Sequence, residues 1–272
     1  INENTSRFFS GSDTSFSHYA ENYTIHLVCL RFCAKIPIVQ TWGLRFLKDL
    51  RLVFDHGGFK VYRATLPPIG VNTYFLTDDT TLLVIDPGTG AFDLVRKGFE
   101  QFEEATGILI THTHYDHIAG LREFPRKRIY LSQAAKPGLF SPEKNLSQQL
   151  SKRGLSLSQD EETVLVLSEG PTDVGSLRFE TWILPGHTPG DALFDFGCCL
   201  FTGDILFENS IGRTDFPGAS ERAMSRSLRR LYTYLKTQQP NKPVFPGHMN
   251  AFTVRDALER NPYLAIFREI ST

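Results

Sequence analysis

The sequence has little of what marks the more specialised protein classes. Only four cysteines occur in 272 residues, too few for a fold held together by disulfides. No apolar run reaches the length of about 18 residues that a membrane span needs, so we expect no membrane partner. The net charge is −1 and the pI about 6.8, which offers no basic surface for nucleic acid. What remains is a chain of 272 residues, 41% hydrophobic, long enough for one substantial core.

The few cysteines predict a reducing compartment. Cys198 and Cys199 are adjacent, so their side chains would point to opposite faces of a strand. Cys29 and Cys33 lack a second close pair of ligands, which argues against structural zinc. We interpret the cysteines as buried thiols and predict a cytoplasmic protein.

Residues 1–50 differ in character from the rest. They are polar and aperiodic at first, the chain starts at Ile1, and the first methionine is Met224. Three interpretations stay open: a flexible extension, a targeting segment, or sequence from outside the natural domain. We therefore predict an N-terminal extension of uncertain nature, residues 1–50, and one domain, residues 51–272.

From about residue 51 the pattern becomes regular. Breaker residues separate short apolar or alternating runs, which predict strands, and a turn is expected at 78–80. Apolar residues at helical spacing predict the helices. Strands and helices in two successive rounds predict an α/β (α+β) domain, with two mixed sheets and helices outside. The predicted strands are 59–64, 72–77, 81–85, 108–111, 128–131, 162–167, 177–184, 192–196 and 198–201, and the predicted helices are 92–104, 143–153, 220–237 and 253–260.

A dense histidine cluster follows the predicted strand at 108–111. His112, His114, Asp116 and His117 lie within six residues. On an extended segment, residues two apart project to the same side, so His112 and His114 can reach one ion. Buried imidazole and carboxylate groups without partners would cost free energy, so this density favours a metal site.

Three more candidates occur at the ends of later apolar runs: His187, Asp204 and His248. Each alone has a plain structural explanation, as a hydrogen-bonded loop histidine or a turn aspartate. Together with the cluster, they predict side chains that converge on one pocket, in which Asp204 has two oxygens able to bridge two cations.

These motifs carry a family resemblance. His-x-His-x-Asp-His at 112–117, Pro-Gly-His-Thr-Pro-Gly at 185–190, Thr-Gly-Asp at 202–204 and Gly-His at 247–248 resemble the metallo-β-lactamase superfamily over about residues 59–270. Segment 206–218, and segment 246–253 followed by 261–264, resemble its glyoxalase II-like (hydroxyacylglutathione hydrolase-like) branch. The resemblance implies a four-layer αββα sandwich with the metals at one edge of two mixed β-sheets. It also implies that His112, His114 and His187 bind a first ion, Asp116, His117 and His248 a second, and Asp204 both.

The implied activity is hydrolysis of a small-molecule thioester or related acyl ester, of the S-D-lactoylglutathione type. Two divalent metal ions, most simply zinc but also iron or manganese, suit such mixed ligands. Cations about 3.5 to 4 Å apart make a bridging hydroxide available near neutral pH, and Asp116 and Asp204 are the predicted catalytic residues. The sequence does not indicate an oligomeric state.

Two further residues are assigned mainly by resemblance. Arg213 occupies the place of a basic residue that contacts glutathione, although it could instead pair with Asp215 to fix its loop. Asp86 is expected to orient a metal-bound histidine, with a plain turn aspartate as the alternative. The chain departs from glutathione-specific members after His248, because only 24 residues follow it and the expected tyrosine is absent.

Other functions stay open. A persulfide dioxygenase with one iron held by two histidines and an aspartate shares this fold. A β-lactam or lactone hydrolase, and a metal-binding scaffold without turnover, are also compatible with the motifs. A phosphodiesterase acting on nucleic acid is disfavoured by the absence of a basic bias.

Overall fold

The computed structural model describes residues 50–102, 105–125, 128–151, 154–158 and 163–269. The chain divides into two compact units, residues 1–38 and 39–272, and every described residue belongs to the second. The extension predicted for residues 1–50 lies outside the described residues except for Leu50, as do Cys29 and Cys33.

One sheet, here called sheet A, places its strands side by side in chain order. Its first four strands are antiparallel neighbours and its last four run parallel, so the sheet is mixed. The predicted turn at 78–80 is confirmed, since Asp78 Oδ1 accepts from the backbone N–H groups of Thr80 and Thr81 at 2.8 Å each. The described strands of sheet A are β1 (Arg51–His56), β2 (Phe59–Leu66), β3 (Val71–Thr77), β4 (Leu82–Ile85), β5 (Gly107–Leu109), β6 (Arg128–Ser132) and β7 (Thr163–Leu167).

The other sheet, sheet B, has the order β13-β12-β11-β10-β9-β8. Only β11 and β12 are parallel neighbours within its described part, so sheet B is mixed as well. Its strands are β8 (Gly170–Val174), β9 (Leu177–Ile183), β10 (Ala192–Asp195), β11 (Leu200–Gly203), β12 (Pro243–Pro246) and β13 (Phe252–Thr253).

The helices begin where the sequence offers caps. Ser220 Oγ accepts from Ala223 N at the start of α5, and Thr253 and Asp256 form a capping box at the start of α6. The helices predicted at 220–237 and 253–260 are thereby confirmed. The described α-helices are α2 (Ala91–Gly98), α3 (Tyr115–Ile118), α4 (Ser147–Leu150), α5 (Glu221–Leu235), α6 (Val254–Arg260) and α7 (Pro262–Glu269).

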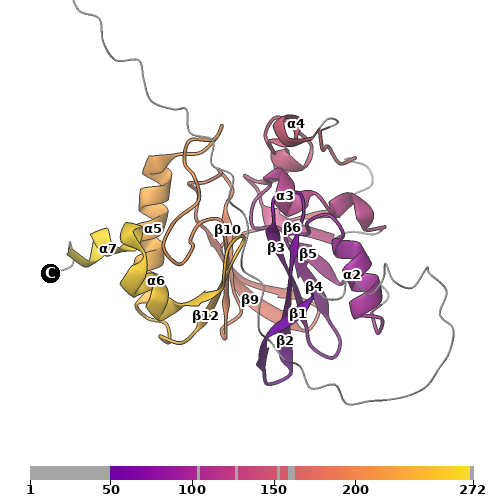
Figure 1. Ribbon diagram of the computed structural model, residues 1–272, viewed down its shortest axis with the longest axis horizontal. Helices are drawn as coiled ribbons and strands as arrows, with labels where there is room; N and C mark the ends of the chain where they lie inside the picture. Colours follow the sequence, from indigo (N-terminus) through magenta and orange to yellow (C-terminus); the bar gives the residue numbers. More distant parts are fainter. Residues whose placement is uncertain (1–49, 103–104, 126–127, 152–153, 159–162, 270–272) are drawn as a thin grey trace, which may run out of the picture. The chain divides into compact units, whose positions relative to one another are not determined.

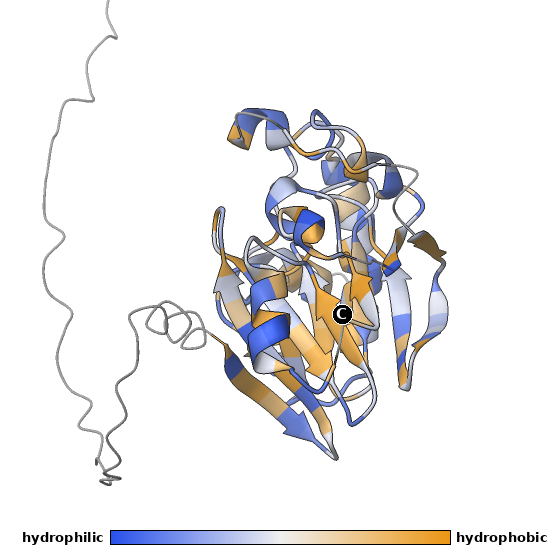
Figure 2. Ribbon diagram, turned by 90° about the vertical axis from the view of Figure 1, so that its right-hand side faces the viewer, coloured by the Kyte–Doolittle hydropathy of each residue, from blue (hydrophilic) through white to orange (hydrophobic). Residues whose placement is uncertain are grey.

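Three apolar clusters define four layers within this unit (Figure 1). One packs α2 and the segments around α3 against the outer face of sheet A, and another packs α5, α6 and α7 against sheet B. The third fills the space between the sheets, where Phe194, Phe201 and Tyr74 are almost fully buried. In Figure 2 the hydrophobic colouring is accordingly concentrated on the strands. The predicted αββα sandwich with two mixed sheets is confirmed.

Two helix predictions were wrong in extent. The helix predicted at 92–104 ends at Gly98, because glycine weakens a helix, yet Phe99 beyond it is still buried in the core. The helix predicted at 143–153 is reduced to α4, and its last two positions, 152 and 153, lie outside the described residues. Here Asn145 Nδ2 donates to the carbonyls of Gly138 and Leu155, an alternative to the helical pattern.

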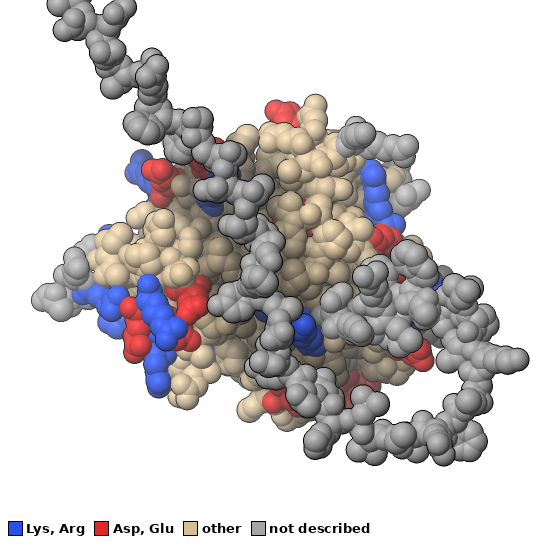
Figure 3. Space-filling model, viewed as in Figure 1, with Lys and Arg blue, Asp and Glu red and all other residues tan. Residues whose placement is uncertain are grey.

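Three remaining observations concern membrane spans, surface charge and the cysteines. No helix among the described residues is long and apolar enough to span a bilayer. Charged side chains of both signs lie near one another on the face shown in Figure 3. Cys198 and Cys199 are free thiols in the loop before β11, not in a strand as predicted, and Cys199 is buried.

Candidate metal centre

The histidine loop joins β5 to α3. His112 and His114 lie on the extended connection, and Asp116 and His117 lie in the single turn of α3 that follows. All four side chains are buried, and His117 is fully enclosed at 0% exposure. The change from extended chain to helix between His114 and Tyr115 turns two pairs of donors towards one region.

The other three candidates come from sheet B. His187 lies in the loop after β9, Asp204 directly follows β11, and His248 follows β12. β11 and β12 are parallel, so their carboxyl ends meet at the same edge of the sheet. That edge faces the carboxyl end of β5, and the donors of the two sheets meet there.

All seven predicted residues come together in three overlapping sets of donor atoms, each set lying within 4.8 Å. Asp204 lies between the other sets: its Oδ1 is 3.6 Å from His117 Nε2, and its Oδ2 is 3.6 Å from His187 Nε2 and 3.7 Å from His248 Nε2. The sets are His112, His114 and His187; His112, His117 and Asp204; and Asp116, His117 and His248.

Buried side-chain nitrogen and oxygen atoms without a hydrogen-bond partner test whether this pocket fits metal ions. Five buried polar side-chain atoms in the described part of the chain have no hydrogen-bond partner, and all five belong to the predicted ligands. Buried polar atoms are normally paired, because burying them alone costs free energy. The donor set therefore fits two divalent cations. The atoms are His112 Nε2, Asp116 Oδ2, His117 Nε2, His187 Nε2 and Asp204 Oδ1.

Hydrogen bonds on the far side of the imidazoles orient those donors. The Nδ1 atom of His187 lies 2.7 Å from the Arg213 carbonyl oxygen, and that of His248 lies 3.2 Å from the Gly70 carbonyl oxygen. A carbonyl only accepts, so each Nδ1 carries a proton and each Nε2 is the nitrogen that faces the pocket.

Asp86 does the same for His117. Its Oδ2 lies 2.9 Å from His117 Nδ1, while both carboxylate oxygens also accept from Thr111, at 2.8 Å from the amide and 2.6 Å from the hydroxyl. Asp86 has a positive φ of 51°, which aims this carboxylate behind the ligand loop. The contact is the one expected of a residue that orients a metal-bound histidine, a role that stays a prediction.

Two glycines make the close packing of the ligands possible. A Cβ atom on Gly247 would lie 2.4 Å from Asp204 Oδ1 and 2.6 Å from His117 Cε1. A Cβ atom on Gly212 would lie 2.8 Å from His187 Cγ. Any side chain at either position would push a donor out of place.

Several residues that position the site were not recognised in the sequence. Asn72 Nδ2 in β3 donates to the carbonyls of Pro246 and Met249 on either side of His248, and Tyr74 Oη donates to the Pro246 carbonyl. A buried asparagine within an apolar strand is the signal that could have revealed Asn72. Asp191, three residues after Thr188, accepts from its amide and hydroxyl and closes the turn that carries His187.

The electrostatics favour neutral imidazoles on one side of the pocket. Burial, together with the neighbouring histidines, lowers the pKa of His112 well below its usual value and that of His114 to about 3. On the other side, burial opposes charge on His117, but Asp116, Asp204 and Asp86 outweigh it and raise its pKa. Protons and cations therefore compete most directly at His117.

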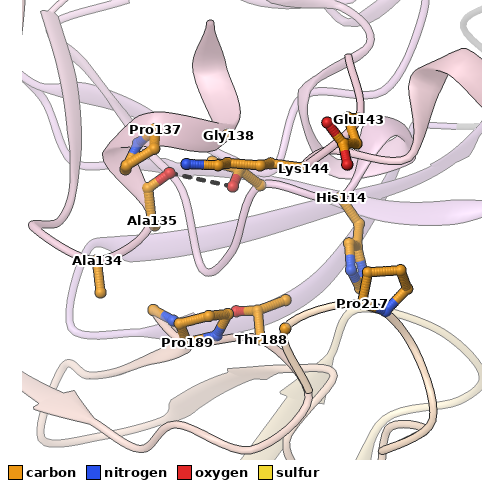
Figure 4. Close-up of a pocket in the computed structure, with 13 residues that line it drawn as sticks. His114, Ala134, Ala135, Pro137, Gly138, Glu143, Lys144, Thr188, Pro189 and Pro217 are labelled. Carbon is orange, nitrogen blue, oxygen red and sulfur yellow. Dashed lines mark hydrogen bonds between the residues drawn. The ribbon is translucent and has the colours of Figure 1, made fainter. Parts of the chain in front are cut away.

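A cavity of about 290 Å³ opens beside His114 (Figure 4). Loops of both sheets line it, including Thr113, Gly138 and Thr188. Arg213 does not line this cavity. It lines a separate groove of about 570 Å³ beside α5 and α7, and its guanidinium forms a two-point contact with Asp215, at 2.9 and 2.7 Å.

Comparison with known sequences gives a consistent result. The family model of the metallo-beta-lactamase superfamily matches residues 66–248. A probable metallo-hydrolase, YqgX of Bacillus subtilis, is 31% identical over 207 residues, which cover 74% of this chain and 96% of the relative. The hydroxyacylglutathione hydrolase GloC of Haemophilus influenzae is 28% identical over 200 residues, covering 69% of this chain and 89% of the relative.

Solved structures agree. The BLEG-1 B3 metallo-beta-lactamase superposes with a TM-score of 0.67 at 30% identity, covering 75% of this chain and 99% of its own. TTHA1623, crystallised in a di-iron-bound form, gives a TM-score of 0.60 at 32% identity, with 74% and 99% covered.

Proposed function

The chain belongs to the metallo-beta-lactamase superfamily, and on that basis we propose that it is a dinuclear metallohydrolase that cleaves an acyl thioester or related ester. The observation that carries the proposal is the set of five unpartnered buried donor atoms, all on the predicted ligands. The two free cysteines in the described part of the chain fit a reducing compartment such as the cytoplasm, which is part of the proposal.

We assign the ligands as two triads with a shared carboxylate. Two divalent cations held there would lower the pKa of a shared water to near neutrality and polarise the substrate carbonyl. Zinc is the first expectation, and iron or manganese would suit the same donors. The first triad is His112, His114 and His187, the second is Asp116, His117 and His248, and the shared carboxylate is Asp204.

The chain's own residues have separate tasks in this proposal. Asp116 Oδ2 lies 3.0 Å from His248 Nε2 and would orient the attacking water and accept its proton. Asp204, with one oxygen towards His117 and the other towards His187, would hold the two halves of the site at a fixed separation. Asp86 would keep His117 in the tautomer that leaves Nε2 free.

A thioester of the S-D-lactoylglutathione type is the substrate we propose. The similarity to GloC, named a hydroxyacylglutathione hydrolase, supports it. The cavity beside His114 is lined mostly by small and apolar residues and suits a compact acyl or thiol group. The similarity to a B3 metallo-beta-lactamase makes β-lactams the second class to assay.

Hydrolysis of S-D-lactoylglutathione by the metal-loaded protein tests the proposal. We expect turnover with about two metal ions per chain, and a loss of about 10²- to 10⁴-fold in kcat for Asp116→Asn. Asp173→Asn is the matched control, because Asp173 is exposed and pairs only with Arg178 in the described structure. Intact thioesters, with oxygen consumed in the presence of glutathione persulfide, would instead establish a dioxygenase.

Arg213 needs its own test, because its guanidinium is already held by Asp215. If Arg213 binds a substrate carboxylate, Arg213→Gln should raise KM for S-D-lactoylglutathione. Asp215→Asn, which releases the guanidinium, should lower it. Equal losses in both variants would show that the pair only fixes the loop.

A further inference from the structure

The cavity beside His114 contains one cationic side chain. Its walls are largely uncharged, formed by Ala135, Pro137 and Pro189 among others, and the charged residues that line it are Glu143 and Lys144. In Figure 4 the Lys144 side chain extends over the cavity, with Thr188 and Pro189 on the opposite wall. The cavity therefore has metal-site residues at one side and an ammonium group along another.

The backbone that carries Lys144 is fixed. Asn145 beside it is fully buried and hydrogen bonded to Gly138 and Leu155, and Lys144 N donates to Ser141 Oγ at 3.3 Å. A side chain on such a fixed segment loses less entropy on binding than one on a free loop.

The Lys144 ammonium has no ion pair or hydrogen bond within the described residues, unlike Arg213, whose guanidinium is neutralised by Asp215. A carboxylate in the cavity would therefore meet an available cation at Lys144. Glu143, next to it in the same lining, would weaken that attraction.

We propose that Lys144 is a specificity-determining residue that binds a substrate carboxylate within the cavity that it shares with His114. The inference rests on the proposed function and names the substrate class: acyl thioesters that carry a carboxylate. The carboxylate can come from the leaving thiol, as in glutathione thioesters, or from the acyl group, and the experiment separates the two.

Three thioesters form the test. S-D-lactoylglutathione carries carboxylates in the thiol, S-glutaryl-N-acetylcysteamine carries one in the acyl group, and S-lactoyl-N-acetylcysteamine carries none.

Lys144→Met should lower kcat/KM by about threefold to tenfold, through KM, for one or both carboxylate substrates and leave the neutral one unchanged. Glu143→Gln should shift the same KM values downwards. Lys136→Met is the matched control, since Lys136 is near in sequence but does not line the cavity.

Equal effects of Lys144→Met on all three thioesters, or none, would overturn the proposal. Calorimetric binding of S-methylglutathione and of glutarate to the metal-loaded protein gives a readout that needs no turnover. Weaker binding of either to Lys144→Met supports the inference even if the wild type cleaves no thioester, an outcome that would count against the proposed function alone. Unchanged binding of both would reject the role of Lys144.

Discussion

Strands β10 and β12 connect two buried charged clusters that differ in how their polar atoms are satisfied. At one end of these strands, Lys242 Nζ donates to Asp195 Oδ1 at 2.7 Å and to Gln238 Oε1 at 2.8 Å, and Tyr234 Oη donates to Asp195 Oδ2. At the other end, around Asp204, five buried side-chain nitrogen and oxygen atoms have no hydrogen-bond partner.

The difference separates a structural cluster from a binding site. Buried charges cost free energy unless they are paired, and the cluster around Lys242 supplies its own pairing. The cluster around Asp204 combines carboxylates with several imidazoles, and five of its buried side-chain nitrogen and oxygen atoms have no hydrogen-bond partner. It becomes complete only with an external partner, and its geometry suits a metal.

Removing that partner should have the largest effect. We expect a strong chelator to abolish turnover, and metal at about 100 times its Kd to stabilise the protein by about 2.7 kcal/mol. Asp204→Asn should lose most of this stabilisation. Activity, metal content and the unfolding midpoint, each measured with and without chelator, check the prediction. A chelator-treated protein with full activity would contradict the comparison.

The satisfied cluster should respond in the opposite way. Lys242→Met leaves the buried Asp195 carboxylate unpaired and should lower the free energy of unfolding by about 3–5 kcal/mol. Metal content should not change. Denaturant unfolding of the metal-free protein compares this variant with Asp204→Asn, which keeps the size of the side chain, removes a carboxylate 3.6 Å from the nearest imidazole nitrogens, and should cost less. A smaller loss for Lys242→Met than for Asp204→Asn would refute our distinction between the clusters.

Asp86 shares features of both clusters: its carboxylate oxygens are hydrogen bonded, as in the cluster around Lys242, yet one of them contacts the proposed ligand His117. Asp86→Asn keeps the size and tolerates the positive φ, but loses one acceptor for Thr111 and His117. We expect metal affinity to fall about 10- to 100-fold. Competition titration with a chromogenic chelator measures it. Asp78→Asn, in the turn between β3 and β4, is the control expected to leave affinity unchanged.

Local signals explain which parts of the fold were predictable. Ser220 and Thr253 cap helices through contacts three residues away, so the starts of α5 and α6 could be read from the sequence. The segment at 143–153 misled because Asn145 is held by residues seven before and ten after it. The strands β1, β8, β12 and β13 were not predicted. β1 and β8 are largely exposed and show no strong apolar pattern, while β12 pairs with β11, about 40 residues earlier in the chain, and β13 has only two residues.

The candidate site shows the same division. The cluster at 112–117 was predictable because metal chemistry restricts both residue type and spacing, whereas His187, Asp204 and His248 were joined to it as a set and through the family motifs. Their supports were not: Asn72 reaches residues 174 and 177 positions away, a contact that no local pattern encodes. The sequence offers two interpretations of Arg213; in the structure its guanidinium pairs with Asp215, and binding of a substrate carboxylate stays a prediction.

The smallest predicted effect concerns Asp191, a buried acid near the site. Burial, opposed by His187 and by hydrogen bonds from Thr188, raises its pKa from 3.8 to about 6. A carboxyl group with a raised pKa stabilises the folded state at low pH and loses this contribution as the pH rises through about 6. Asp191→Asn resembles the protonated form, so the wild type should gain roughly 1 kcal/mol relative to this variant between pH 7 and pH 5. Denaturant unfolding of both metal-free proteins across that range gives the difference. A constant difference would mean that Asp191 does not titrate there, and its hydrogen bonds to Thr188 would then hold the carboxylate charged throughout.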